Sequence, residues 1–181
     1  MIIAKEKRSE NIIEYLLYMY QIEDIIRASN FDLSLINNSI VQNYDQPEDV
    51  KLEILQWYED HINFLKTEGK QNRGHLVYLE NIANDLQELH FRLLNINTEE
   101  EYKKLYDKAS PSIQVLQSKT QGPQNHEINL CLNGLYGYLL LKLRKKQISR
   151  ETKDSIIDIS QMLAFLAGKF QKIETGKDEL I

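Results

Sequence analysis

The chain has few helix-breaking residues and almost no cysteine. Its 181 residues include 7 Gly and 3 Pro beside many Leu, Ile, Glu, Lys and Gln residues, a balance that favours helices. Its one cysteine, Cys131, excludes an internal disulfide. Because Leu130 and Leu132 flank Cys131, we expect a buried small hydrophobe rather than a reactive thiol. These features predict an all-α protein that suits a reducing compartment.

The chain also lacks an apolar segment long enough to span a membrane. Its most apolar window, 128–143, is shorter than the roughly 18 to 20 residues that a span needs, and it contains Asn129, Asn133 and Lys142. The basic N-terminal stretch is interrupted by Glu14 and is followed by no small-residue cleavage site, so no signal peptide is expected. We therefore expect a cytoplasmic protein with no membrane partner.

The chain has no net positive charge. The net charge is -5 and the pI is about 5.5, so the overall field does not attract phosphate backbones. A basic cluster closes one predicted helix, where cations complement the helix dipole, and no aromatic residues interleave with it for base stacking. The cluster consists of Lys142, Arg144, Lys145, Lys146 and Arg150. We therefore predict no nucleic-acid partner.

Apolar residues recur at helical spacing in six or seven segments. Pro111 either ends the fifth of these helices near Ala109 or kinks it, and Ser110 caps a short successor if the helix ends. The predicted helices cover 9–28 with Ser9 as N-cap, 32–44, 47–68, 75–96, a segment that begins with a Thr98 and Glu101 capping box, 126–147, and 149–174. We predict a single-domain helical bundle or compact helical array over 1–174, with a flexible tail over 175–181.

The sixth predicted helix, 126–147, is apolar on nearly all sides. We therefore expect it at the centre of the molecule, with the other helices around it. Gly134 and Gly137 lower the helix propensity of this segment, which indicates that a packing constraint keeps them. We expect a neighbouring helix to approach closely at both glycines.

Glu23 interrupts the apolar stripe of the first predicted helix, and Arg27 follows it one turn later. The stripe consists of Ile12, Leu16, Met19 and Ile26. Glu23 is either a functional carboxylate, serving as a general base or metal ligand, or one half of a structural i,i+4 ion pair with Arg27. A single carboxylate with no other partner located favours the structural pair.

Three histidines lie on or beside apolar stripes: His61 in the third predicted helix, and His75 and His90 in the fourth. Together with Glu23 they are candidates for a metal site in a bundle. However, none of them has Asp, Glu or His three or four residues away, and His75 and His90 are about 22 Å apart at 1.5 Å per residue. This spacing favours core histidines bonded to backbone or tyrosine, and we predict no metal and no cofactor.

Asn129 and Asn133 lie one turn apart on the sixth predicted helix, on the same face as Gly137. Two interpretations are open for this pair. The amides could line a polar pocket for a small ligand, or they could be buried groups that fix the register of the helix. Because buried polar groups more often satisfy one another than bind ligands, the second interpretation is favoured.

The opening segment MIIAKEKRSENIIEYLLYMYQIEDIIRA and the later segment LNGLYGYLLLKLRKKQISRET resemble a bacterial family of uncharacterised helical proteins, a domain-of-unknown-function family. The resemblance runs along the full length of the chain. It rests on the order of apolar and polar positions rather than on a catalytic signature. It implies a bacterial cytoplasmic origin, and it implies no activity, cofactor or functional residues.

Two functional hypotheses follow from the sequence. The leading hypothesis is a non-enzymatic helical interaction or scaffold protein that self-associates, because aromatic and apolar residues are abundant and no catalytic constellation is visible. The alternative is an enzyme or small-ligand-binding protein with a polar pocket in the helical core, built around Glu23, the histidines and Asn133.

Overall fold

The computed structural model describes residues 2–95, 99–120 and 126–178, and in these residues the chain is helical with no strand. The prediction of an all-α fold is confirmed, but the described ranges form eight α-helices rather than the predicted six or seven. They are α1 (Ile2–Glu10), α2 (Ile12–Ala28), α3 (Leu33–Ser39), α4 (Glu48–Thr67), α5 (Val77–Asn95), α6 (Glu100–Lys119), α7 (Glu127–Leu143) and α8 (Arg150–Glu174), with a short 3-10 helix, η1 (Val41–Asn43), between α3 and α4.

The first predicted helix, 9–28, corresponds mainly to α2, and the prediction missed α1, which precedes it. Ser9 lies inside α1, where its hydroxyl donates to the carbonyl oxygen of Glu6, so the prediction that Ser9 caps the helix is wrong. Asn11 interrupts the helix instead with an extended backbone, φ -154°. Its side-chain oxygen accepts hydrogen bonds from the backbone N–H groups of Ile13 and Glu14, which makes Asn11 the N-cap of α2.

The helix α6 runs through Pro111 and ends at Lys119. The predicted end near Ala109 and the separate helix capped by Ser110 are therefore wrong, and Thr98 of the predicted capping box lies outside the described residues. Pro111 removes one hydrogen bond of the helix, yet Ala109 and Ile113 on either side of it are buried. Packing of this face, chiefly against α8, holds the helix together across the proline.

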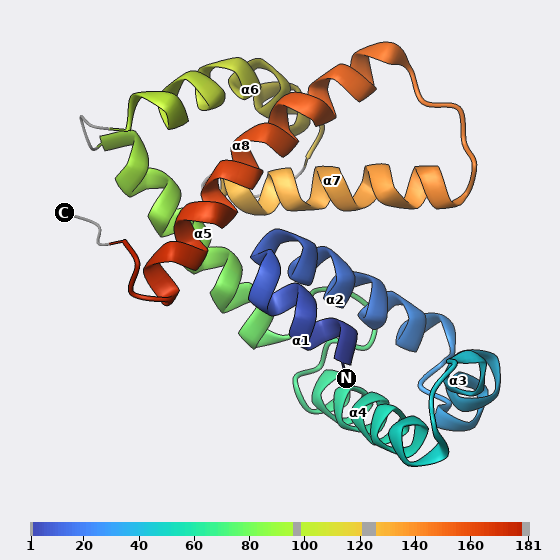
Figure 1. Ribbon diagram of the computed structural model, residues 1–181. Coiled ribbons are helices and arrows are strands. Elements are labelled where there is room, and N and C mark those ends of the chain that lie inside the picture. The colour runs from blue at the N-terminus through green and yellow to red at the C-terminus, as the bar shows by residue number, and fades with distance from the viewer. Residues whose placement is uncertain (1, 96–98, 121–125, 179–181) are drawn as a thin grey trace.

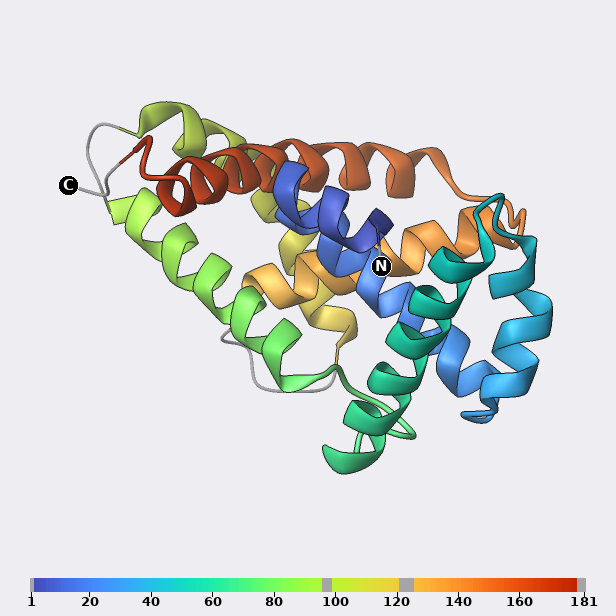
Figure 2. The same cartoon turned by 60° about the horizontal axis from the view of Figure 1, so that its bottom comes forward.

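The helices form two groups, α1 to α4 and α5 to α8, which pack on each other chiefly where α2 meets α7 and α8. In Figure 1, α1 to α4 lie in the lower half of the molecule and α6 to α8 in the upper half. Both views place α3 and α4 at the end opposite α6 (Figures 1 and 2). One hydrophobic core cluster nevertheless takes buried residues from every α-helix. None of the helices in the described ranges is long and apolar enough to cross a membrane.

The helix α7, which corresponds to the sixth predicted helix, is not the central element. It packs against α2, α5, α6 and α8, and its first half buries Ile128, Cys131 and Leu132. Its last turns leave Leu141 and Leu143 exposed. Cys131 is buried as predicted, and burial raises the pKa of its thiol to about 12.

The end of α8 at Glu174 matches the predicted boundary of the helical part. Beyond it, Asp178 forms an ion pair with Lys169 at 3.0 Å, and the remaining residues of the predicted tail, 179–181, lie outside the described ranges. At the other end of the chain, Arg8 forms a two-point ion pair with Glu174. This pair fastens α1 to the last turn of α8.

The two glycines of α7 differ in their surroundings. A Cβ atom added to Gly134 would lie 2.9 Å from Cδ1 of Leu116 in α6, so the predicted close approach is confirmed there. Apart from its own helix backbone and chain neighbours, no atom of the described residues comes within 4 Å of a Cβ added to Gly137, so the same prediction is wrong at that position.

These surroundings predict different responses to alanine. Gly137→Ala should raise the free energy of unfolding by about 1 kcal/mol, because alanine favours the helix and meets no neighbour. Gly134→Ala gains the same propensity but must displace Leu116, so its net effect should be smaller. Urea unfolding of the two variants beside the parent measures the difference. An equal or larger gain for Gly134→Ala would contradict the close packing of α7 on α6.

Candidate functional site

Glu23 of α2 is a fully buried carboxylate, with 0% of its surface exposed. Its two oxygens bind groups that lie more than 50 residues away in the chain. Oε2 lies 2.6 Å from Nδ1 of His75, and Oε1 accepts a hydrogen bond of 2.8 Å from the backbone N–H of Leu76. Nη2 of Arg27 lies farther away, 3.8 Å from Oε2. The i,i+4 pair predicted from the sequence therefore exists, but the main partners of Glu23 come from the loop between α4 and α5.

Arg27 binds the same loop one turn farther along α2. Its Nε and Nη2 each donate to the carbonyl oxygen of Lys70 at 3.2 Å, and Nη2 also donates to the carbonyl oxygen of Gly74. Its Nη1 donates to Oδ1 of Asp24 at 3.0 Å. Gly74 has a positive φ of 83°, a backbone conformation that favours glycine. Together, Glu23 and Arg27 fix the loop that leads into α5.

This anchoring sets the position and the tautomer of His75. The imidazole stacks on the ring of Tyr20, with the ring centroids 3.5 Å apart and the planes 17° from parallel. Because an ionised carboxylate can only accept hydrogen bonds, Nδ1 carries the proton that it shares with Glu23. In the neutral imidazole, Nε2 is then an acceptor. The side chain of His75 is 26% exposed, so the ring is accessible to a ligand.

His75 lines a pocket of about 310 Å³ between α2, α5 and α7. The lining residues are Tyr20, His75, Glu80, Asn84, Asn129 and Asn133. The structure thus brings together three of the residues singled out in the sequence, His75, Asn129 and Asn133, with Glu23 directly behind His75. The pocket combines one carboxylate, one imidazole and three amides, which can both donate and accept hydrogen bonds.

The two amides of α7 are not buried register groups. Asn133 is exposed and Asn129 is half-buried, and both border the pocket. This corrects the interpretation favoured by the sequence, which placed both amides in the core. The physical reason is that α7 covers the core with the face of Ile128 and Leu132, so that its asparagine positions turn away from the core.

Sequence reasoning missed three lining residues: Tyr20, Glu80 and Asn84. Tyr20 is buried and belongs to the apolar face of α2, so its position in the sequence indicated only that it packs in the core. Glu80 and Asn84 lie one turn apart on the polar side of α5, where such residues are ordinary surface positions. No local signal separates them from other surface residues.

His61 and His90 lie elsewhere, and each has a hydrogen-bond partner at Nδ1. Nδ1 of His61 lies 2.7 Å from the carbonyl oxygen of Trp57, and Nδ1 of His90 lies 2.6 Å from the hydroxyl of Tyr102. Nε2 of His90 also lies 3.3 Å from a carboxylate oxygen of Glu127. This is the arrangement expected for core histidines bonded to backbone or tyrosine. In the part of the chain that the structure describes, no group of three or more His, Cys, Asp or Glu could hold a metal ion.

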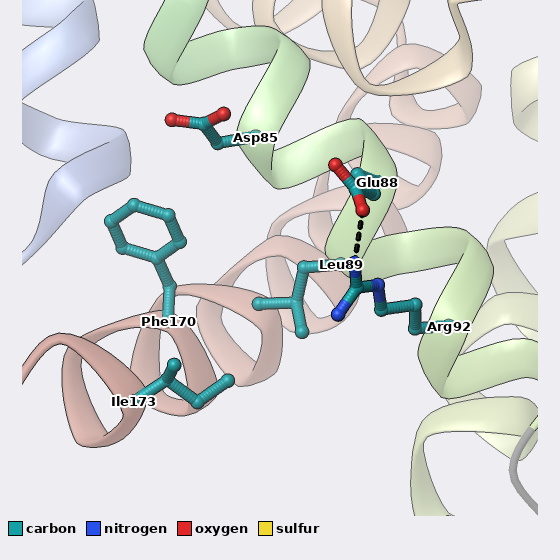
Figure 3. Close-up of a pocket in the computed structure, with 6 residues that line it drawn as sticks. All are labelled: Asp85, Glu88, Leu89, Arg92, Phe170 and Ile173. Carbon is teal, nitrogen blue, oxygen red and sulfur yellow. Dashed lines mark hydrogen bonds and ion pairs between the residues drawn. The ribbon is translucent and has the colours of Figure 1, made fainter. Parts of the chain in front are cut away.

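A second, smaller hollow of about 170 Å³ lies between α5 and α8 (Figure 3). Leu89, Phe170 and Ile173 supply its apolar wall, while Glu88 and Arg92 form an ion pair with each other at its edge. Both charged side chains are more than half exposed to solvent. Glu88 and Arg92 already bind each other and are exposed to water. This hollow therefore offers a ligand fewer available polar side chains than the pocket at His75 does.

Removing the buried carboxylate should destabilise the fold. Glu23→Ala is expected to lower the free energy of unfolding by about 3 to 5 kcal/mol, because it leaves His75, the Leu76 amide and Arg27 without their shared acceptor. Glu23→Gln should lower the free energy of unfolding by less, since an amide oxygen can still accept a hydrogen bond from the backbone N–H of Leu76. Glu14→Ala, on the same helix and 61% exposed, is the control and should cost less than about 1 kcal/mol. Urea unfolding measures all three, and a gain in stability for both Glu23 variants would contradict a structural role.

The two core histidines predict how stability depends on pH. Burial lowers the pKa of His61 and of His90 below the usual 6.5, although Glu127 opposes this for His90. The unfolded chain therefore takes up protons first as the pH falls, so stability should be lost from about pH 6.5 downward. Urea unfolding at several pH values measures the slope. The slope should shrink in the double variant His61→Gln, His90→Gln and persist in His126→Gln, and a pH-independent parent would contradict this prediction.

Comparison with known proteins identifies the family of the chain. No curated protein and no solved structure matches it. One family model, described as Domain of unknown function (DUF4924), matches residues 1–177, which agrees with the resemblance to an uncharacterised helical family. The bacterial origin implied by that resemblance stays a prediction. Because the match covers almost the whole sequence, the chain belongs to the DUF4924 family of domains of unknown function.

Proposed function

We propose that the protein binds a small polar molecule in the pocket between α2, α5 and α7. The observation that carries this proposal is the fully buried Glu23 behind His75, whose imidazole forms part of the pocket wall. Burying a carboxylate is costly unless it is fully hydrogen-bonded. Here its hydrogen bonds orient an accessible imidazole toward a cavity, an arrangement that suits ligand recognition.

The size and composition of the pocket support the same function. Its volume of about 310 Å³ lies at the lower end of the range for small-molecule sites. The side-chain amides of Asn84, Asn129 and Asn133 offer both donors and acceptors along the wall. A ligand of few atoms with several hydrogen-bonding groups would match these walls better than an apolar ligand.

The scaffold hypothesis has weaker support. Large apolar side chains are exposed on α1 and on α3 to α8, so they are spread over the molecule rather than gathered on one helix. Single exposed apolar residues are normal in monomeric proteins. Self-association therefore stays a prediction, and the pocket gives the more specific hypothesis.

A fragment screen on the 15N-labelled full chain, read by NMR, tests the proposed function. Polar fragments should shift the side-chain amide signals of Asn129 and Asn133 together. Asn133→Ala should weaken these fragments about threefold to tenfold, because one hydrogen bond contributes about 0.5 to 1.5 kcal/mol. Asn81→Ala, an exposed position of α5 that does not line the pocket, should leave their binding unchanged. The proposal fails if no fragment shifts the pocket signals, or if Asn133→Ala binds the fragments as tightly as the parent.

A further inference from the structure

The pocket wall itself carries a carboxylate and no lysine or arginine among the described residues. Of the six lining residues, all of them in the described ranges, Glu80 is the only Asp, Glu, Lys or Arg, and its side chain is 44% exposed. The carboxylate of Glu23 lies directly behind His75. Both carboxylates contribute to raising the pKa of Tyr20, although burial of the phenol is the larger cause. An anionic ligand would therefore meet the like charge of Glu80 in the wall, with the buried carboxylate of Glu23 behind His75.

The cations beside the pocket are already engaged. Nζ of Lys70 lies 2.6 Å from Oε1 of Glu80, and the guanidinium of Arg27 binds two backbone carbonyls and Asp24. Phosphates and carboxylates are usually held by arginine, lysine or clustered backbone N–H groups. Here Lys70 is paired with the carboxylate of Glu80, and Arg27 is held by Asp24 and two backbone carbonyls, so both cations already have partners that offset their attraction for an anion.

The wall instead offers several hydrogen-bond acceptors. Glu80 presents a carboxylate, and the three asparagines present amide oxygens. Amines, amides and hydroxyl groups donate the hydrogen bonds that such acceptors require. The asparagine N–H groups can bind an amide or hydroxyl oxygen on the same ligand.

We infer that the ligand of this pocket is a small neutral or cationic molecule that donates N–H or O–H hydrogen bonds, and that the pocket discriminates against carboxylates and phosphates. This inference rests on the proposed function and assigns it a chemical class of ligand. Discrimination arises from Glu80 and from the engaged state of Lys70 and Arg27, rather than from the shape of the cavity.

A matched series of probes tests this inference on the 15N-labelled full chain. The probes are 3-aminopropanamide (cationic), succinamide (neutral), succinamate (anionic) and inorganic phosphate, added at millimolar concentrations. The three amides share one terminal amide group and differ at the other end. The cationic and neutral probes should shift the signals of His75, Asn129 and Asn133 and bind at least about threefold more tightly than succinamate, a difference of roughly 0.7 kcal/mol. Phosphate should not bind.

Substitution of Glu80 tests whether the charge of this side chain, rather than the shape of the cavity, sets the ligand preference. Glu80→Gln should weaken 3-aminopropanamide more than succinamide, and it should fold because the side chain is partly exposed and lies on the surface of α5. Glu88→Gln, the same change on the same helix outside this pocket, is the control and should leave the preference unchanged.

The outcomes distinguish the inference from the proposed function. Equal or tighter binding of succinamate or phosphate, or a preference that survives Glu80→Gln, would overturn the inference while the pocket still binds a ligand. Absence of binding by all four probes would also overturn it. In that case, fragments of other chemistry that bind at Asn129 and Asn133 would leave the proposed function standing.

Discussion

The structure depends on a buried carboxylate that is satisfied by a distant loop. Glu23 lies in the apolar face of α2, where its charge can persist only if hydrogen bonds replace water. The imidazole of His75 and the backbone N–H of Leu76 supply them. The same two bonds fix the start of α5 against α2 and expose the imidazole to a pocket. One interaction thus connects the attachment of the loop before α5 to α2 with the imidazole that lines the pocket.

Most of the fold could be predicted from helical periodicity. The errors in the predicted helix boundaries have either a local cause in the sequence or a cause in tertiary packing. The break between α1 and α2 carries a local signal, since Asn11 is followed three residues later by Glu14, as in a capping box. The continuation of α6 through Pro111 carries none, because packing against α8 outweighs the lost hydrogen bond. Intrinsic propensities decide a helix end only where tertiary packing does not.

The site could be predicted only in part. Glu23 was found because a charge interrupts an apolar stripe, but its partners His75 and Leu76 are distant in the sequence and lie in or beside a loop. Periodicity relates residues within one helix and gives no information about which loop meets which face. Asn133 was noticed for the same reason as Glu23, yet which side of α7 faces the core is set by its packing against four other helices.

The most direct test of the central claim is the tautomer of His75 in the full-length protein, measured by long-range 1H–15N NMR correlation together with hydrogen exchange of the Leu76 amide. The account predicts that Nδ1 carries the proton whenever the ring is neutral, because Glu23 accepts from it, and that the Leu76 amide exchanges slowly because it donates to the same buried carboxylate. A neutral ring protonated on Nε2, with a rapidly exchanging Leu76 amide, would contradict it.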